Sequence, residues 1–479
     1  MLASRSPARA LRAPLLRTRN RAALHTSALA RSQLADFGKE HVVRGLKRVT
    51  DTVMESGNGS WVTMEGGRKL LDFTAGIGVV NFGHCHPLIS GAAAEQAMKI
   101  VHAQTTQSSI AFSRPYLELV EAMIPLMPDP SLDSFFFWNS GAEAIEASVK
   151  LARAVTKRQN VIVMQGGFHG RTFGAMALTR SKTIYSVGQG PLMPGVFATP
   201  FPYWHQLGLT PAATEKEMVD MCTYQLELLF AQQSAPSDTA AILIESVLGE
   251  GGYVPAPPAY LAYLRRVCDE HGILLIVDEV QSGWGRTGKK FAIEHSGVRP
   301  DVMVTAKGLA NGFPLSAIVT RKELADKQAP GTMGGTYNGN AVSCAAAIAV
   351  TKVIQTEQIL ENVAARSEQL VSALKAMQAD PALKGIIADV RGQGLMIGVE
   401  FFSPAPHVPG DNASNLRPSA PENLAARIAQ KCVDSGMLIL TTSVYEVIRF
   451  IPMLNVSEEE MKHGISIFKA ACEEVVKEG

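Results

Sequence analysis

One lysine stands where an apolar strand is expected to end. Lys307 follows the run DVMVTA and precedes the Gly-rich turn GLANGFPLS. Lysine is among the side chains least often fully buried, so a lysine at this place either bends out to water or has a partner. A desolvated amine can act as a nucleophile toward a carbonyl carbon or as a general base. Lys307 is therefore the first candidate for chemistry.

A second candidate follows the apolar run SFFFW, which leads into NSGAEAIEASVKLAR. Ser140 and Glu143 have the spacing of a capping box ahead of a helix. The backbone N–H groups of Gly141 and Ala142 in the first helical turn are suited to bind a phosphate. As a lone motif this signal is weak, because most capping boxes only cap a helix.

Aromatic, cationic and acidic side chains follow three further apolar runs. The run NVIVM precedes QGGFHGRT, which carries Phe168 and Arg171 on a Gly-rich turn. The run AAILIE ends on Glu245, and ILLIVDE brings Asp278, followed by Gln281. A buried carboxylate is costly unless it is paired, and a single one at a strand end is more often a cap or a salt-bridge residue. Two carboxylates that each end an apolar run favour a shared site.

These runs alternate with longer helical patterns from about Leu132 onward. Near-continuous apolar strands separated by helices are typical of α/β proteins whose mostly parallel sheet is covered on both faces. Ligands bind such sheets at the carboxyl ends of the strands. The amine, the phosphate cradle, the aromatic ring and the carboxylates are thus expected at one sheet edge, and pyridoxal 5'-phosphate requires that set. A dehydrogenase is not favoured, because no GxGxxG fingerprint opens a βαβ unit.

The C-terminal part, from about Ser343, begins with a helical segment and continues through DVRGQGLMIGVEF and VIRFIPML, which are expected to be strands of a second sheet. The stretch 403–423, rich in Pro, Asn and Ser, is expected to be an exposed loop. The N-terminal segment WVTMEGGRKLLDFTAG has the pattern of a β-hairpin that could pack with the C-terminal part.

The composition indicates a globular protein with a large core. The chain has 479 residues, 46% of them hydrophobic and 19% charged, and no apolar run approaches the roughly 20 residues that span a bilayer. No membrane partner is therefore predicted. His84 and His86 in GHCHP are interpreted as part of a turn, because no second cluster of metal ligands is evident. No metal site is predicted.

Residues 1–35 differ from the rest of the chain. They contain seven arginines, several Ser and Thr, no lysine and no acidic residue, which is typical of a mitochondrial transit peptide. The alternative is a basic tail that binds an anionic partner. Seven of the 45 basic residues lie there, which leaves 38 basic residues against 44 acidic ones in residues 36–479. Nothing in this balance favours a nucleic acid as a partner.

Five motifs in order carry a close resemblance to a known family: NSGAEAIEASVKLAR, GGFHGRT, LIVDEVQSGWGRTGK, AKGLANGFPL and GGTYNGN. From about Phe37 to the C-terminus, the chain resembles the class III (ω-amino acid) aminotransferases, which are fold type I pyridoxal phosphate enzymes. It is most similar to 4-aminobutyrate aminotransferases, with acetylornithine and ornithine aminotransferases next. The resemblance implies a large domain with a mostly parallel seven-stranded sheet and a smaller α/β domain. The implied boundaries are 1–35 for the transit peptide, 36–84 and 343–479 for the small domain, and 85–342 for the large domain.

The resemblance also implies roles toward the cofactor. Lys307 would be the Schiff-base lysine and would move the proton during catalysis. Asp278 would pair with the pyridinium nitrogen, Gln281 would bond the phenolic oxygen, and Phe168 would stack on the ring. The phosphate would be held by Ser140, Gly141, Ala142 and, from the neighbouring subunit of a homodimer or dimer of dimers, Thr336.

For the substrate, Arg449 in VIRFIP matches the arginine that binds the α-carboxylate of glutamate or 2-oxoglutarate, although alone it would be an ordinary strand arginine. Arg171 matches the arginine that binds the distal carboxylate. Glu245 matches a glutamate that would neutralise Arg449 when an ω-amino substrate is bound. Ile77 stands where ornithine enzymes tend to have tyrosine, which favours 4-aminobutyrate. Ser246, where the family usually has proline, is a departure, as is a long loop at 404–417.

The sequence thus predicts an enzyme of the mitochondrial matrix that transfers the amine of an ω-amino acid, foremost 4-aminobutyrate, to 2-oxoglutarate by a ping-pong mechanism. The nearest alternative is an N-acetylornithine or ornithine aminotransferase, and an aminomutase that uses the same cofactor is more distant. A different class of alternative is a non-catalytic protein of the same fold, kept for binding or assembly. Such a protein typically loses the lysine, whereas Lys307 is present.

Overall fold

The computed structural model describes residues 34–46, 48–103, 111–408, 411 and 416–478. The chain divides into two compact units, one comprising residues up to 55 together with 64–68, and the other comprising 56–63 and the chain from 69 onward. Helix α1 (Leu34–His41) belongs to the first unit. The predicted transit peptide, 1–35, lies almost wholly outside the described residues. The site described below belongs to the second unit.

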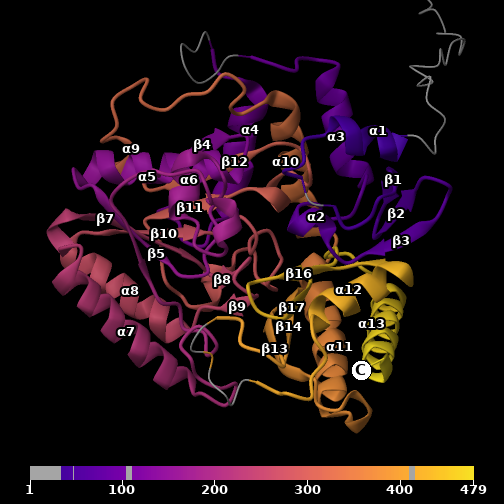
Figure 1. Ribbon diagram of the computed structural model, residues 1–479. Helices are drawn as coiled ribbons and strands as arrows, with labels where there is room; N and C mark the ends of the chain where they lie inside the picture. Colours follow the sequence, from indigo (N-terminus) through magenta and orange to yellow (C-terminus); the bar gives the residue numbers. More distant parts are fainter. Residues whose placement is uncertain (1–33, 47, 104–110, 409–410, 412–415, 479) are drawn as a thin grey trace, which may run out of the picture. The chain divides into compact units, whose positions relative to one another are not determined.

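A seven-stranded sheet forms the centre of the second unit (Figure 1). Its strand order is β4-β12-β11-β10-β7-β5-β6, and only β12 runs against the others. The predicted mostly parallel sheet is therefore confirmed. The strands are β4 (Ser134–Trp138), β5 (Asn160–Met164), β6 (Val196–Thr199), β7 (Thr239–Glu245), β10 (Leu274–Asp278), β11 (Val302–Thr305) and β12 (Ser316–Thr320).

Helices cover both faces of this sheet, as the continuous apolar strands predict. Successive residues of one strand enter two different cores: Val161 and Val163 pack with α5 and α6, whereas Ile162 and Met164 pack with the cluster that includes α7, α8 and α10. The period of two in a strand produces this division. The helices are α5 (Gly141–Thr156), α6 (Phe173–Leu178), α7 (Glu215–Gln232), α8 (Pro258–His271) and α10 (Ala341–Thr356).

The register of the sheet sets the positions of the predicted site residues. Asp278, the last residue of β10, lies opposite Glu245 of β7 on one side and Val304 of β11 on the other. Lys307 follows Val304 by three residues. The two carboxylates and the lysine therefore reach the same carboxyl edge of the sheet.

A second, antiparallel sheet has the order β13-β14-β17-β16 and confirms the second sheet predicted from the C-terminal motifs. Helices α11, α12 and α13 pack with it in one hydrophobic core. The bounds are β13 (Ile387–Gln393), β14 (Met396–Phe401), β16 (Leu440–Thr442), β17 (Val447–Phe450), α11 (Ile359–Ala379), α12 (Leu424–Asp434) and α13 (Glu458–Glu478).

The predicted N-terminal hairpin consists of β2 (Trp61–Met64) and β3 (Lys69–Asp72). Strand β3 pairs in parallel with β15 (Met437–Leu438), so the expected association with the C-terminal part is confirmed. The implied domain boundaries themselves stay a prediction. The remaining strands and α-helices of the described residues are β1 (Met54–Asn58), β8 (Val247–Leu248), β9 (Val254–Pro255), α2 (Ala75–Gly78), α3 (Pro87–Ala97), α4 (Arg114–Met123) and α9 (Lys322–Ala325).

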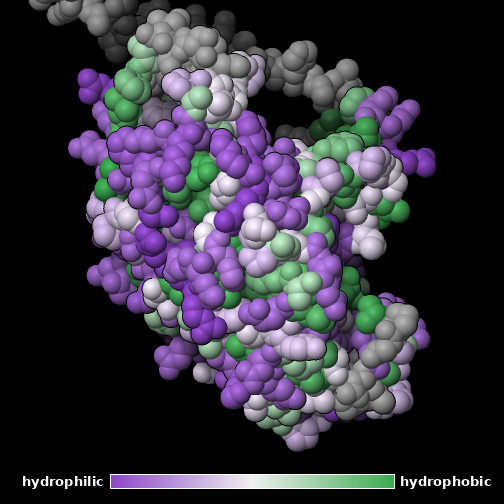
Figure 2. Space-filling model, turned by 90° about the vertical axis from the view of Figure 1, so that its left-hand side faces the viewer, coloured by the Kyte–Doolittle hydropathy of each residue, from purple (hydrophilic) through white to green (hydrophobic). Residues whose placement is uncertain are grey.

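None of the helices in the described ranges combines the length and apolar character needed to cross a membrane. One face of the molecule carries hydrophilic residues interspersed with smaller apolar areas (Figure 2).

Candidate active site

A cavity of about 380 Å³ lies at the carboxyl edge of the central sheet. This volume is within the range of small-molecule sites, about 300 to 1,000 Å³. Eight of the residues predicted from sequence line it: Ser140, Gly141, Ala142, Phe168, Glu245, Asp278, Gln281 and Lys307. Segments far apart in the sequence are thus brought to one place by the parallel strands.

Lys307 begins a short 3-10 helix directly after β11, with φ at +48°. A residue other than glycine in this left-handed region is uncommon, and such strain concentrates at functional sites. Burial lowers the pKa of the Lys307 amine, an effect that the carboxylates of Glu250, Asp278 and Glu245 oppose. Within the described residues the amine has no ion pair or hydrogen bond. It is therefore available to a ligand and less strongly held in its protonated form than a free lysine.

Asp278 is held from two sides. Its Oδ2 lies 2.8 Å from Nδ1 of His169, and its Oδ1 accepts a hydrogen bond of 2.9 Å from the backbone N–H of Val280. Both side chains are buried, and Nε2 of His169 has no hydrogen-bond partner in the described part of the chain. A carboxylate oriented in this way can hold a cation such as a protonated ring nitrogen. Sequence reasoning missed His169, although it follows Phe168 directly in the Gly-rich turn.

The start of α5 has the predicted Ser140 cap, but the returning bond of the capping box differs, because the Glu143 carboxylate accepts from the backbone N–H of Asn139 and not of Ser140. The Ser140 hydroxyl accepts a hydrogen bond of 3.3 Å from the Glu143 N–H and donates one of 2.9 Å to the Glu143 carboxylate. Helix geometry leaves the N–H groups of Gly141 and Ala142 without an intrahelical acceptor. Because both residues line the cavity, this end of the helix can bind a phosphate there.

Glu245 fixes two neighbouring backbone segments. One carboxylate oxygen accepts a 2.9 Å hydrogen bond from the Phe168 N–H, and the other accepts one of 2.9 Å from the Gly249 N–H. Burial raises the pKa of Glu245 to about 7; Asp278 acts in the same direction, whereas His169 opposes the rise. Glu245 therefore anchors the loop that begins at Gly249.

Arg449, on β17, forms a buried ion pair with Glu250 and not with Glu245. The resemblance implied Glu245 as the residue that neutralises Arg449 when an ω-amino substrate is bound; in this structure the partner of Arg449 is Glu250, and each oxygen of Glu245 accepts a backbone N–H instead. Glu250 lies five residues later, on the turn between β8 and β9, which passes next to β17. A second acidic residue in the Gly-rich stretch LGEGG was the signal that sequence reasoning passed over.

Four of the predicted residues do not line the cavity within the chain, namely Arg449 and three others. Arg171 is exposed, and its guanidinium carbon lies 5.9 Å from the ring centre of Tyr185, which itself lies edge-on against Phe168. Ile77 is 37% exposed. Thr336, assigned to the neighbouring subunit by resemblance, is exposed on the surface.

The residues present fit pyridoxal 5'-phosphate. Lys307 supplies an accessible amine, Asp278 a fixed carboxylate, and the start of α5 free N–H groups. Gln281 is buried at the cavity, and its Oε1 has no hydrogen-bond partner among the described residues. A buried unpartnered amide oxygen is costly, so a ligand hydroxyl placed there would relieve it.

Comparisons with known proteins agree with this fit. The family model "Aminotransferase class-III" matches residues 44–472. A 5-aminovalerate aminotransferase of Pseudomonas putida is 37% identical over 91% of this chain and 96% of its own length. A 4-aminobutyrate aminotransferase of Escherichia coli is 39% identical, with coverages of 85% and 90%, and an acetylornithine aminotransferase of Archaeoglobus fulgidus is 33% identical, with coverages of 90% and 97%. An amine transaminase from an uncultivated Pseudomonas species, solved in its PLP-bound form, has a TM-score of 0.77 at 28% identity over 88% of this chain and 94% of its own.

Proposed function

We propose, from the premise that this chain belongs to the class III aminotransferases, that it transfers the amine of an ω-amino acid, foremost 4-aminobutyrate, to 2-oxoglutarate. The products are the corresponding semialdehyde and glutamate, formed in two half-reactions that share one site. The observation that carries this proposal is the buried ion pair between Arg449 and Glu250.

That ion pair answers a physical problem. The site must accept glutamate or 2-oxoglutarate, with two carboxylates, and an ω-amino acid, which has one. A buried arginine without a partner is strongly unfavourable. Glu250 neutralises Arg449 while the donor is bound; when Glu250 releases it, the planar guanidinium is free to bind an α-carboxylate through two hydrogen bonds. Glu250 thereby takes the role that the resemblance implied for Glu245.

The chain's own residues have separate tasks in the reaction. The bound cofactor supplies an electron sink for the carbanion that forms next to the amine. Lys307 Nζ takes the proton from the donor carbon that carries the amine and, in the second half-reaction, returns a proton to the α-carbon of the product amino acid. Its lowered pKa favours the free base that this step needs. Asp278, oriented by His169, would hold the ring nitrogen, and Gln281 the phenolic oxygen.

The residue that binds the distal end of the donor determines how long the donor can be. Arg171 is proposed to bind the distal carboxylate, and its exposed side chain leaves room for donors of different length. A second candidate donor is 5-aminovalerate, one methylene longer, because a 5-aminovalerate aminotransferase is 37% identical over most of the chain. N-acetylornithine is the third candidate, supported by the acetylornithine aminotransferases among the relatives.

We also propose that the enzyme works as a homodimer. Several large apolar residues are exposed on the described part of the chain, among them Met98 at 88%, Phe112 at 79% and Tyr337 at 66%. A second cavity of about 680 Å³ includes Tyr337 and shares Asn139 with the lining of the first. A second copy covering this surface would bring its Thr336, next to Tyr337, to the phosphate of the first.

Residues 1–35 are proposed to direct import into the mitochondrial matrix, on the strength of their arginine-rich, acid-free composition. Fusing these residues to a fluorescent protein tests this. We expect the fusion to fluoresce in mitochondria, and we expect this location to be lost when the seven arginines are replaced by glutamine. Diffuse fluorescence of the unaltered fusion would contradict the proposed import.

The substrate proposal is tested by supplying purified protein with 2-oxoglutarate and one donor at a time, and measuring the glutamate formed. The donors are 4-aminobutyrate, 5-aminovalerate, N-acetylornithine and ornithine. We expect glutamate to form with 4-aminobutyrate, and we expect Lys307→Ala to abolish this reaction. Formation with N-acetylornithine or ornithine alone would move the enzyme to a different substrate class and leave the cofactor site unchanged.

A further inference from the structure

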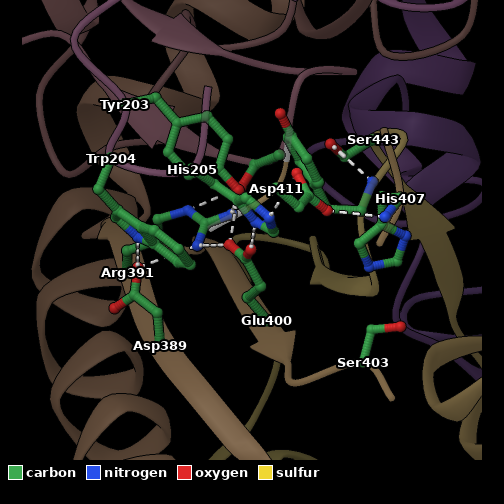
Figure 3. Close-up of polar contacts among 12 residues, drawn as sticks. Tyr203, Trp204, His205, Asp389, Arg391, Glu400, Ser403, His407, Asp411 and Ser443 are labelled. Carbon is green, nitrogen blue, oxygen red and sulfur yellow. Dashed lines mark hydrogen bonds and ion pairs between the residues drawn. The ribbon is translucent and has the colours of Figure 1, made fainter. Parts of the chain in front are cut away.

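A buried polar cluster lies outside the cavity, next to the loop that carries Glu250. Its members are Tyr203, His205, Asp389, Arg391 and Glu400 (Figure 3). None of them lines the active-site cavity. Glu400 is fully buried. Burying charged groups is costly even when they are paired, and apolar residues could fill the same space. A role other than packing is therefore expected for this cluster.

Arg391, on β13, is the centre of the cluster. One terminal nitrogen donates to the carboxylates of both Glu400 and Asp389, at 2.9 Å for Asp389, and the other donates to the Tyr203 hydroxyl at 3.2 Å. The guanidinium also lies over the Tyr203 ring, 4.8 Å from its centre. Burial alone would raise the pKa of Glu400, but Arg391 and His205 bring it below its ordinary value. The cluster therefore holds Arg391 as a fixed cation.

The remaining donors of Arg391 point to the Glu250 loop. Nε and Nη2 both donate to the Gly252 carbonyl, at 3.0 and 2.7 Å. Gly252 has φ at +128°, and a Cβ atom there would lie 2.9 Å from Nη2. The close approach of the guanidinium to the loop thus depends on a glycine at this position.

Other contacts hold the rest of the loop. The Gly249 N–H donates to Glu245, and the Glu250 carbonyl accepts from the Ser443 N–H at 2.9 Å and the Thr442 hydroxyl at 3.2 Å. Arg391 completes this set at the C-terminal end of the loop. The backbone on both sides of Glu250 is thereby fixed, and so is the reach of its carboxylate to Arg449.

We propose that Arg391, held by Glu400 and Tyr203, is a positioning residue that sets the selectivity of the enzyme for donors with one carboxylate over glutamate. This inference rests on the proposed function, in which Glu250 neutralises Arg449. A loop released from Arg391 would hold Glu250 less firmly and leave Arg449 less often neutralised. Donors with one carboxylate would then react more slowly, whereas glutamate, which needs Arg449 free, would not.

The test compares Arg391→Lys and Tyr203→Phe with Arg265→Lys in the full-length holoenzyme. Lysine keeps the charge but lacks the planar fork, and Tyr203→Phe removes one hydroxyl from the cluster. Arg265 is the matched control, since it is a largely buried arginine paired with Asp301 away from the loop. Each half-reaction is measured separately, with 4-aminobutyrate and with glutamate. We expect the ratio of the two kcat/KM values to fall about tenfold in Arg391→Lys, to fall less in Tyr203→Phe, and to stay constant in Arg265→Lys.

A second readout does not depend on activity. Hydrogen exchange of the backbone between residues 246 and 256 is expected to accelerate in Arg391→Lys and Tyr203→Phe but not in Arg265→Lys. An unchanged selectivity ratio together with unchanged exchange would overturn the proposal, even if the variants melt at a lower temperature. If Arg391→Lys does not fold, Tyr203→Phe decides the question. If the unaltered enzyme rejects 4-aminobutyrate, the proposed function fails, and unchanged exchange in the variants would then refute the positioning role separately.

Discussion

At the scale of single residues, the chemistry depends on the amine of Lys307. The backbone of this residue is strained, its amine has no ion pair or hydrogen bond among the described residues, and burial lowers the pKa of the amine. We predict that Lys307→Ala abolishes the visible absorbance of the lysine-bound cofactor and lowers turnover by about three orders of magnitude or more. Lys322→Ala is the control, because Lys322 is an exposed lysine paired with Asp326. An alanine variant that kept both absorbance and turnover would show that another group carries the reaction.

Glu250 is expected to matter for one class of substrate only. In Glu250→Gln a neutral amide can no longer offset the buried charge of Arg449. We expect kcat/KM for 4-aminobutyrate to fall about tenfold or more, while that for glutamate changes by no more than a few-fold. Separate half-reaction kinetics with the two amino acids measure this. An equal loss for both would mean that Glu250 has only a structural role.

Glu245 predicts a pH dependence of stability in the cofactor-free protein. Its pKa of about 7 lies above its ordinary value of 4.5, so the folded state binds the proton more tightly than the unfolded state. The contribution of Glu245 to the free energy of unfolding is therefore fully present below about pH 4.5, and it is lost as the pH rises through about 7. Between pH 4.5 and 8 we expect a loss of about 3 kcal/mol in the free energy of unfolding that is absent in Glu245→Gln. Denaturant titrations at several pH values measure it, and parallel pH profiles of the two proteins would contradict the raised pKa.

At the scale of elements, strand ends and one helix start create the site. Strands β4 and β5 coincide with the predicted runs SFFFW and NVIVM, and β7, β10 and β11 differ from the predicted runs by a residue or two at their ends. Apolar runs determine where the strands lie, and parallel pairing then places the following residues at one edge. Cofactor-contacting candidates could thus be predicted from local sequence.

The partner of Arg449 could not be predicted in the same way. Glu245 and Glu250 are five residues apart, and the choice between them depends on which backbone N–H groups face each carboxylate after the chain turns at Gly249. No periodicity in the sequence encodes that turn. His169 was missed for a related reason, because its contact with Asp278 joins two loops through the folded sheet.

The helix start gives a prediction with a matched control. Ser140 caps α5 and Thr214 caps α7, and each accepts a hydrogen bond from the N–H three residues later. Ser140→Ala and Thr214→Ala should both cost about 1 kcal/mol in the free energy of unfolding. Only Ser140→Ala should also weaken cofactor affinity, by about tenfold, because the Ser140 hydroxyl can turn from the Glu143 carboxylate and donate its hydrogen bond to the charged phosphate. Equal cofactor affinity in both variants would show that Ser140 only caps the helix.

At the scale of the whole molecule, the proposed dimer makes each site depend on two chains. We predict that Thr336→Ala weakens cofactor retention and that mixing it with Lys307→Ala, followed by subunit exchange, restores activity. A mixed dimer would contain one site with an unaltered Lys307 from one chain and an unaltered Thr336 from the other. Activity of the mixture no greater than the average of the two variants would contradict a shared site.

The most direct measurement of the central claim is a single half-reaction. Purified enzyme loaded with pyridoxal 5'-phosphate is mixed, without any 2-oxo acid, with 4-aminobutyrate, 5-aminovalerate, N-acetylornithine or ornithine, and the loss of the visible absorbance of the bound cofactor is followed. Fast loss with 4-aminobutyrate, reversed by adding 2-oxoglutarate, is the result that an ω-amino acid aminotransferase with the Arg449–Glu250 pair predicts. No loss with 4-aminobutyrate, at any concentration at which another donor reacts, would contradict it.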